Sequence, residues 1–231
     1  KSNIRIAPRK GWSWSRDGTK NSVTILDENL THLGQLEGLG KEGERITAVR
    51  YVGDRGYVVT FRQTDPFYTL DLSDVKAPKQ VGELQIDGFS RYLHPIDENY
   101  ILGVGRDADS QGVQKGLMLE LFDISDFANP KVADKVVIGD RYTYSEAEYN
   151  HKAFVYRSSD KLFGFNYINS WRDSSEAYYG VYEINASHEI QELQKFDGNP
   201  KRAIFFNSDE KRRALTMGYG KFYTKLIDGE K

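Results

Sequence analysis

Residues 46–85 decide the fold, and they read ITAVRYVGDRGYVVTFRQTDPFYTLDLSDVKAPKQVGELQ. Four short runs in this stretch are rich in β-branched and aromatic residues, and Gly, Asp, Pro or Ser bounds each run. Such runs are typical of strands joined by tight connections. The segment Gly53-Asp54-Arg55-Gly56 closes the first hairpin. The stretch therefore predicts one four-stranded antiparallel unit.

A short acidic motif of this unit recurs further along the chain. Its second copy begins 123 − 71 = 52 residues after the first, and a looser third copy follows 183 − 123 = 60 residues later. A period of about 50 residues that carries four strands and no helical pattern is typical of a β-propeller blade. The copies are LDLSDVKAPK at 70–79, FDISDFANPK at 122–131 and YEIN at 182–185.

With this register, residues 1–231 are predicted to form one all-β domain, a β-propeller with about four to five blades present. The first blade lacks its innermost strand and the last lacks its outermost strand. Proteins normally cover exposed sheet edges, so we expect a fragment of a larger propeller, rearranged ends, or an oligomer or further segment that completes the ring. The predicted units are a partial blade over 1–36, blades over 46–85, 89–138 and 151–196, and a partial blade over 201–227.

Four runs of the sequence also carry a resemblance to a known family. Together they resemble bacterial and archaeal secreted proteins with a β-propeller domain that is distantly related to WD40 repeats. The resemblance covers most of residues 23–167. It implies an extracytoplasmic or cell-surface protein that is usually longer than this chain, and it implies no catalytic residues. The runs are AVRYVGDRGYVVTFRQTDPFYTLDLSD at 48–74, YLHPIDENYILGVGRDAD at 92–109, LFDISDFANPK at 121–131 and YNHKAF at 149–154.

Composition excludes several classes of function. The chain has 32 Lys and Arg against 34 Asp and Glu, so a net charge of −2 provides no field that would attract nucleic acid. There is no cysteine, which excludes disulfides, thiolate nucleophiles and cysteine-ligated metal sites. The apolar runs have the length of strands, so the sequence predicts no transmembrane segment.

Propeller connectivity sorts the connections onto two faces. Links between the second and third strands of a blade emerge together with the links between blades, and the other hairpin turns emerge on the opposite face. The long connections at 9–21, 37–44, 107–115, 139–150 and 169–177 all belong to the first of these faces, which we call the long-loop face. Long loops on a rigid scaffold usually carry binding residues.

The long-loop face is predicted to bind a protein or a glycan, without a cofactor. All three tryptophans fall on its predicted loops, and Trp, Tyr and Arg are the residues that most often anchor interfaces. The competing interpretation of any single residue is structural, with Arg–Asp pairs joining loops and Trp rings filling gaps between blades. The predicted contact residues are Trp12, Trp14, Arg62, Arg106, Asp107, Arg141, Tyr142, His151 and Trp171.

The segment Asp107-Ala108-Asp109-Ser110-Gln111-Gly112 resembles the start of a calcium-binding loop. Two carboxylates lie two residues apart, and a glycine takes the sixth position. The pattern then departs, because Met118 stands at the twelfth position, where an EF-hand needs a bidentate Glu. Calcium held by Asp107 and Asp109 is thus the alternative to an ordinary acidic turn.

The alternative function is a metal-assisted hydrolase with its site at the mouth of the central channel. His94 and His151 are predicted at innermost strands, and Asp107 or Glu148 would supply a carboxylate. A metal would need three such side chains within about 2.0 to 2.6 Å of one point. A purely structural role, with the propeller as a spacer, is the third alternative.

Overall fold

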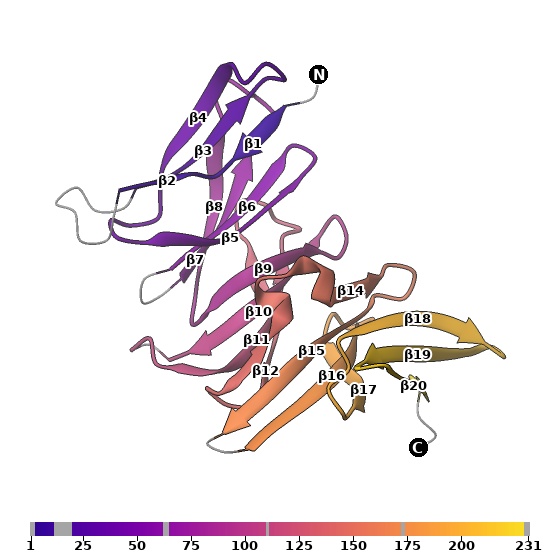
Figure 1. Cartoon of the computed structure of the whole chain (residues 1–231). Helices are drawn as coiled ribbons and strands as arrows, with labels where there is room; N and C mark the ends of the chain where they lie inside the picture. The colour runs from indigo at the N-terminus through magenta and orange to yellow at the C-terminus, as the bar shows by residue number, and fades with distance from the viewer. Residues whose placement is uncertain (1–2, 12–19, 62–64, 110, 172–173, 229–231) are drawn as a thin grey trace.

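The computed structural model describes residues 3–11, 20–61, 65–109, 111–171 and 174–228, without the side chains of Asp65, Trp171 and Ser174. Within these residues the chain forms twenty strands and two short 3₁₀ helices. The strands build five antiparallel sheets, which stand side by side in an open arc with the N-terminal and C-terminal sheets at its two ends (Figure 1). The prediction of an all-β, incomplete β-propeller is confirmed.

The first three sheets contain strands in chain order. β1 and β2 both pair with one edge of β3, so they are two halves of a strand that is interrupted at Ala7 and Pro8. The first sheet comprises β1 (Ile4–Ile6), β2 (Arg9–Lys10), β3 (Lys20–Leu26) and β4 (His32–Leu39); the second comprises β5 (Arg45–Val52), β6 (Arg55–Phe61), β7 (Asp65–Asp71) and β8 (Lys79–Ile86); the third comprises β9 (Phe89–Pro95), β10 (Tyr100–Ala108), β11 (Gln114–Asp123) and β12 (Lys131–Ile138).

The fourth sheet has an interrupted innermost strand. β13 (Thr143–Ser145) and β14 (Phe154–Arg157) pair with the same edge of β15, and residues 146–153 leave the ladder between them. We call residues 146–153 the insert; it contains η1 (Glu146–Glu148) and η2 (His151–Ala153). The remaining strands are β15 (Leu162–Trp171), β16 (Ser174–Ile184) and β17 (Ile190–Phe196), followed by the fifth sheet with β18 (Arg202–Ser208), β19 (Lys211–Gly218) and β20 (Lys221–Leu226).

Several connections are shorter than the sequence predicted. β10 continues to Ala108 and β11 begins at Gln114, so both ends of the predicted connection 107–115 belong to strands. The ladder of β15 and β16 likewise continues to the pair Trp171–Ser174, within the predicted connection 169–177. The connection 139–150 contains β13 and η1. The strands extend into the predicted connections because their backbone groups form hydrogen bonds across the hairpin instead of to water. Within the described residues, no helix is long and apolar enough to cross a membrane.

Four hydrophobic clusters hold the sheets together, one between each pair of neighbours. The clusters require sheets that are apolar on both faces, and β6 and β11 accordingly have runs of buried residues without alternation. Burial of each large apolar side chain contributes about 1.5–3 kcal/mol. Phe67 and Phe122 stack across the second interface with ring centroids 4.2 Å apart. Each cluster contains residues of both neighbouring sheets, for example Val23 and Leu70, Phe67 and Phe122, Leu119 and Phe163, and Leu162 and Ala214.

The acidic motif of the sequence forms a turn that ties each sheet to its predecessor. Thr69 of the second sheet donates its hydroxyl to the carbonyl of Phe127, in the turn of the third sheet, at 2.6 Å. A fourth copy of this turn lies at the end of β20. It is not apparent in the sequence, because Leu226 replaces the acidic residue of the other copies. In each copy one backbone N–H bonds back to the first hairpin: Leu72 to Asp54, Ile124 to Asn99, Ile184 to Lys161, and Ile227 to Arg212.

Substitution of Gly82 by alanine tests the docking of this turn. A Cβ at Gly82 would lie 2.7 Å from the carbonyl oxygen of Ala128 and 2.7 Å from the hydroxyl of Thr69. The turn must move away, so we expect Gly82→Ala to lower the free energy of unfolding by about 1–3 kcal/mol in urea denaturation. Gly38→Asn is the control, because Gly38 has open space around it and Asn tolerates its φ of +76°. Equal losses in both variants would contradict the docking.

Candidate functional site

The insert is held in place by its own sequence. Ser145 caps η1, accepting the N–H of Ala147 at 3.0 Å, and the carboxylate of Glu148 accepts the N–H of Ser145 at 3.0 Å. These two bonds form a capping box, which the pattern Ser-x-x-Glu specifies locally. Asn150 caps η2 by accepting the N–H of Lys152 at 3.1 Å. The insert therefore has a defined conformation although it interrupts a strand.

Glu148 connects the insert to the third sheet through a buried ion pair. Its carboxylate is only 2% exposed, and it accepts two hydrogen bonds from the guanidinium of Arg106, at 2.8 Å from Nε and 3.1 Å from Nη2. Arg106 also donates to the carbonyl of Thr143, and Arg91 lies 3.8 Å from the same carboxylate. A buried carboxylate is tolerated when its charge and lone pairs are matched in this way.

Glu146 connects the insert to the fifth sheet. Its Oε1 lies 3.0 Å from Nη2 of Arg202, the first residue of β18, and it accepts a further bond from the amide of Asn150. The hydrogen bond from Arg202 is the main reason that the pKa of Glu146 lies below its ordinary value. The insert thus bridges the third, fourth and fifth sheets, and it lies beside β9 and β10 (Figure 1).

The predicted contact residues differ in what surrounds them. Arg106 is engaged by Glu148, and Oδ1 of Asp107 lies 2.6 Å from Nζ of Lys135 on β12, so both are largely buried in structural ion pairs. Arg141 lies over the ring of Tyr142 at 4.8 Å, and His151 is exposed on the insert. Trp12, Trp14 and Arg62 lie outside the described residues; the backbone of Trp171 ends β15, and its side chain also lies outside them. A binding role for these nine residues stays a prediction.

Two exposed tyrosines on the same segment were missing from that prediction. Tyr144 is 39% exposed on β13, and Tyr149 is 77% exposed at the end of η1. The capping box that precedes Tyr149 was the available signal, because it indicates an ordered turn instead of a free loop. We call Arg141, Tyr142, Tyr144, Tyr149 and His151 the aromatic segment.

Asp107 and Asp109 have different partners. Asp107 pairs with Lys135, whereas Asp109 accepts the N–H groups of Gln111 and Val113 and lies 2.8 Å from Nζ of Lys115. The calcium site stays a prediction that these contacts do not favour.

The residues proposed for a hydrolase also remain apart. Nδ1 of His94 is 2.8 Å from the hydroxyl of Tyr92, and Phe154 and Tyr156 pack against its ring. Burial, together with the charge of Arg50, lowers the pKa of His94 to about 4, so its imidazole is neutral at pH 7. Among the residues that the structure describes, no three His, Asp or Glu side chains gather as metal ligands would. The hydrolase stays an untested alternative.

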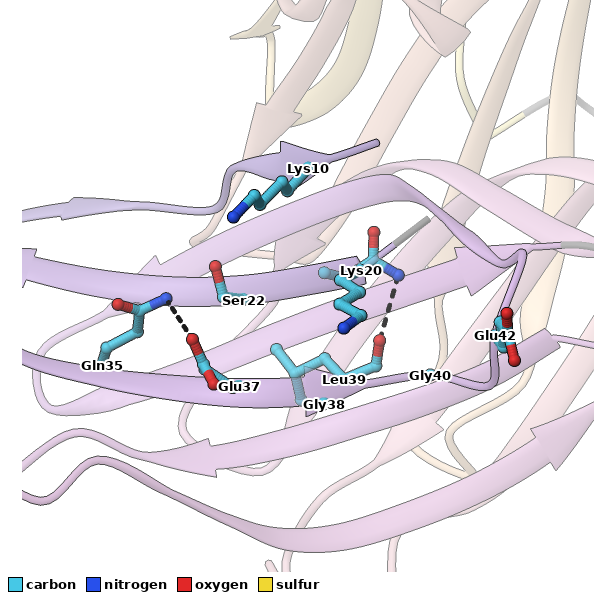
Figure 2. A pocket seen from close by; sticks show the side chains of 10 residues that line it. Lys10, Lys20, Ser22, Gln35, Glu37, Gly38, Leu39, Gly40 and Glu42 are labelled. Carbon is cyan, nitrogen blue, oxygen red and sulfur yellow. Dashed lines mark hydrogen bonds between the residues drawn. The ribbon is translucent and has the colours of Figure 1, made fainter. Parts of the chain in front are cut away.

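A recess of about 800 Å³ lies on the first sheet (Figure 2). Strands β2, β3 and β4 line it with Lys10, Lys20 and Glu37, and the amide of Gln35 donates to Glu37 at 3.2 Å. None of the predicted contact residues in the described part of the chain lines this recess. Its exposed, long side chains are not preorganised for a ligand.

Glu120 is a buried carboxyl that the sequence did not single out. It lies on β11 between Gly103 and Lys135, it is 2% exposed, and its Oε2 has no hydrogen-bond partner. Lys135 is already engaged by Asp107 and by the carbonyl of Asp87. Burial is the main cause that raises the pKa of Glu120 to about 7, with Lys135 opposing and Asp107 and Asp87 adding to the increase.

The raised pKa of Glu120 predicts a pH-dependent stability. A carboxyl with a folded-state pKa of about 7 and an ordinary value of 4.5 stabilises the fold below pH 4.5, and this stability is lost as the pH rises to about 7. We expect Glu120→Gln to match the wild type near pH 4 and to exceed it at pH 8 by on the order of 3 kcal/mol in urea unfolding. A difference that does not change with pH would show that folding leaves the pKa of Glu120 at its ordinary value.

The ion pair of Glu148 makes a second prediction on stability. Glu148→Gln leaves the Arg106 charge buried without its partner, so we expect a loss of about 3–5 kcal/mol in the free energy of unfolding. Asp109→Asn is the matched control, because it removes a carboxylate from an exposed pair with Lys115 and should leave stability nearly unchanged. Similar small losses in both variants would contradict the bridging role of the insert.

Comparisons with known proteins agree with this architecture. A family profile described as "Beta propeller domain" matches residues 1–225. The chain is 45% identical over 209 residues to an uncharacterized protein of Archaeoglobus fulgidus, and 38% identical over 205 residues to one of Methanocaldococcus jannaschii. These matches cover 88% and 89% of the chain but 29% and 30% of those relatives, so the chain spans less than a third of their length.

A solved structure shows the same fold at low sequence identity. It is an X-ray structure from Sulfolobus tokodaii, described as a hypothetical selenium-binding protein, with a TM-score of 0.51 and 12% identity. The match covers 90% of this chain and 49% of that one. Because the profile extends over nearly the whole sequence, the chain belongs to the Beta propeller domain family.

Proposed function

We propose that this protein is a binding module that recognises a partner protein through the aromatic segment. The observation that carries the proposal is the exposure of Tyr144 and Tyr149 on a segment that is held by the buried Arg106–Glu148 ion pair and the partly exposed Arg202–Glu146 ion pair. Exposed tyrosines on an ordered segment are suited to anchor an interface, because little conformational entropy is lost when they bind.

The surroundings of the tyrosines favour a partner with acidic groups. Arg141 is exposed on the same segment, and so is Lys152, which directly follows the segment. Glu146 and Glu148, the acidic residues of the insert, are engaged by Arg202 and Arg106. The cations therefore contribute more to the exposed field of this segment than the carboxylates do.

The proposal includes an extracytoplasmic location, which the resemblance of residues 23–167 to secreted propeller proteins supports. A protein in that location would meet partners at the cell surface. Labelling of intact cells with a membrane-impermeant biotin reagent should modify the protein, whereas exclusive labelling after lysis would contradict this part of the proposal.

Affinity capture tests the binding surface. We expect cross-linking and mass spectrometry to identify a partner that binds the wild type, and Tyr144→Ala with Tyr149→Ala to weaken it by about tenfold or more, the effect of losing two interface anchors. Tyr219→Ala is the control, because Tyr219 is also 77% exposed but lies at the end of β19. Equal binding by the double variant would contradict the proposal, and binding on a glycan array in place of a protein would assign the surface to glycans.

A further inference from the structure

The innermost strands of the second to fifth sheets carry basic side chains without acidic ones. β5, β9, β13, β14 and β18 together contain five arginines and no Asp or Glu. Strands that line one side of a structure with a single sign of charge raise the local concentration of counter-ions. The arginines are Arg45, Arg50, Arg91, Arg157 and Arg202.

Four of these arginines have a partner within the chain. Arg157 pairs with Asp160 at 2.5 Å, Arg202 pairs with Glu146, and Arg91 lies near Glu148. Arg45 lies over the ring of Phe61 at 6.0 Å. Each of these charges is thus accounted for by a neighbouring carboxylate or ring.

Arg50 differs from the other four. Within the described residues it forms no hydrogen bond and no ion pair, and its Nε is buried without a partner. The side chain is half-buried on β5, opposite Tyr57 in the ladder. A buried donor without a partner destabilises the fold, so an acceptor that reaches it is bound favourably.

The charge of Arg50 acts on a hydrogen-bonded pair of the neighbouring sheet. β5 packs against β9, and the hydroxyl of Thr47 on β5 donates to the carbonyl of Ser90 on β9 at 2.9 Å. Coulombic interaction with Arg50 lowers the pKa of both Tyr92 and His94, although burial raises that of Tyr92 overall. Tyr92 and His94 share one hydrogen bond of 2.8 Å. Whichever ring carries the shared proton, the pair retains one further donor, either the hydroxyl of Tyr92 or the Nε2–H of His94. Phe154 and Tyr156 of β14 form the apolar wall beside it.

We propose that Arg50, together with the Tyr92–His94 pair, forms a binding position for a carboxylate on the side of the sheets that the innermost strands line. The guanidinium supplies a fixed charge and two parallel N–H donors, the geometry that a carboxylate matches best. The Tyr92–His94 pair adds a neutral donor, and no acidic side chain of the innermost strands competes for Arg50. The carboxylate belongs to a small organic acid or to an acidic side chain of a peptide.

Thermal unfolding with succinate as the probe tests this position. We expect succinate to raise the midpoint of the wild type in a saturable manner, because a ligand bound only by the folded state stabilises it. Sodium chloride of equal ionic strength is the reference for screening. Arg50→Met should weaken the apparent affinity by about tenfold or more, and Arg45→Met, which removes another innermost arginine, should not. Equal shifts in the two variants, or equal shifts with chloride, would overturn the proposal.

The imidazole of His94 provides a second readout in the unmodified protein. The groups that face it are Arg50 from β5, Tyr92 from β9 and Tyr156 from β14. A carboxylate at Arg50 offsets the guanidinium charge, so the pKa of His94 should rise from about 4 when succinate is added, as followed by NMR. An unchanged titration would overturn the proposal even if Arg50→Met fails to fold. A larger response to an amidated, Glu-containing peptide would assign the carboxylate to a peptide, and a larger response to succinate to a free acid.

Discussion

Each inner sheet of this protein has two apolar faces, and neighbouring sheets cover them. This constraint explains the stacked arrangement, since central strands such as β6 and β11 are buried on both sides and cannot border water. It also explains the repeat, because each unit needs the same two interfaces. The docked turn at the end of the third strand adds hydrogen bonds between neighbouring sheets, such as that from Thr69 to Phe127.

The insert has a different role, because its glutamates neutralise the charges of arginines near the centre of the arc. Arg91 and Arg106 come from the third sheet and Arg202 comes from the fifth, and all three converge on two glutamates of one eight-residue segment. Their compensation allows three sheets to meet there without a buried unpaired charge. The same bonds hold Tyr144 and Tyr149 toward solvent, so an element that stabilises the fold also presents the aromatic segment. Arg50 has no such compensation, and it is therefore the arginine available to an anion.

The sequence predicted the fold well because blade strands are specified locally, by short β-branched and aromatic runs between turn residues. It predicted the candidate site less well. Arg106 and Asp107 were predicted to contact a partner at the long-loop face, yet β10 includes both of them and their side chains pair with Glu148 and Lys135. The aromatic segment was only partly anticipated, because the exposure of Tyr149 depends on how the insert leaves the ladder.

The sequence by itself determined the period, the turn motif, the four strands of the unit at 46–85 and the capping box of the insert, because each depends on residues that are close along the chain. The tertiary structure alone decided which charges meet. Arg106 and Glu148 lie 42 residues apart, and Glu146 and Arg202 lie 56 apart. Pairs at such separations form only when the sheets have stacked, since the apolar interfaces bring the strand ends together. The same stacking left Arg50 without a carboxylate and enclosed Glu120 without a partner for its Oε2.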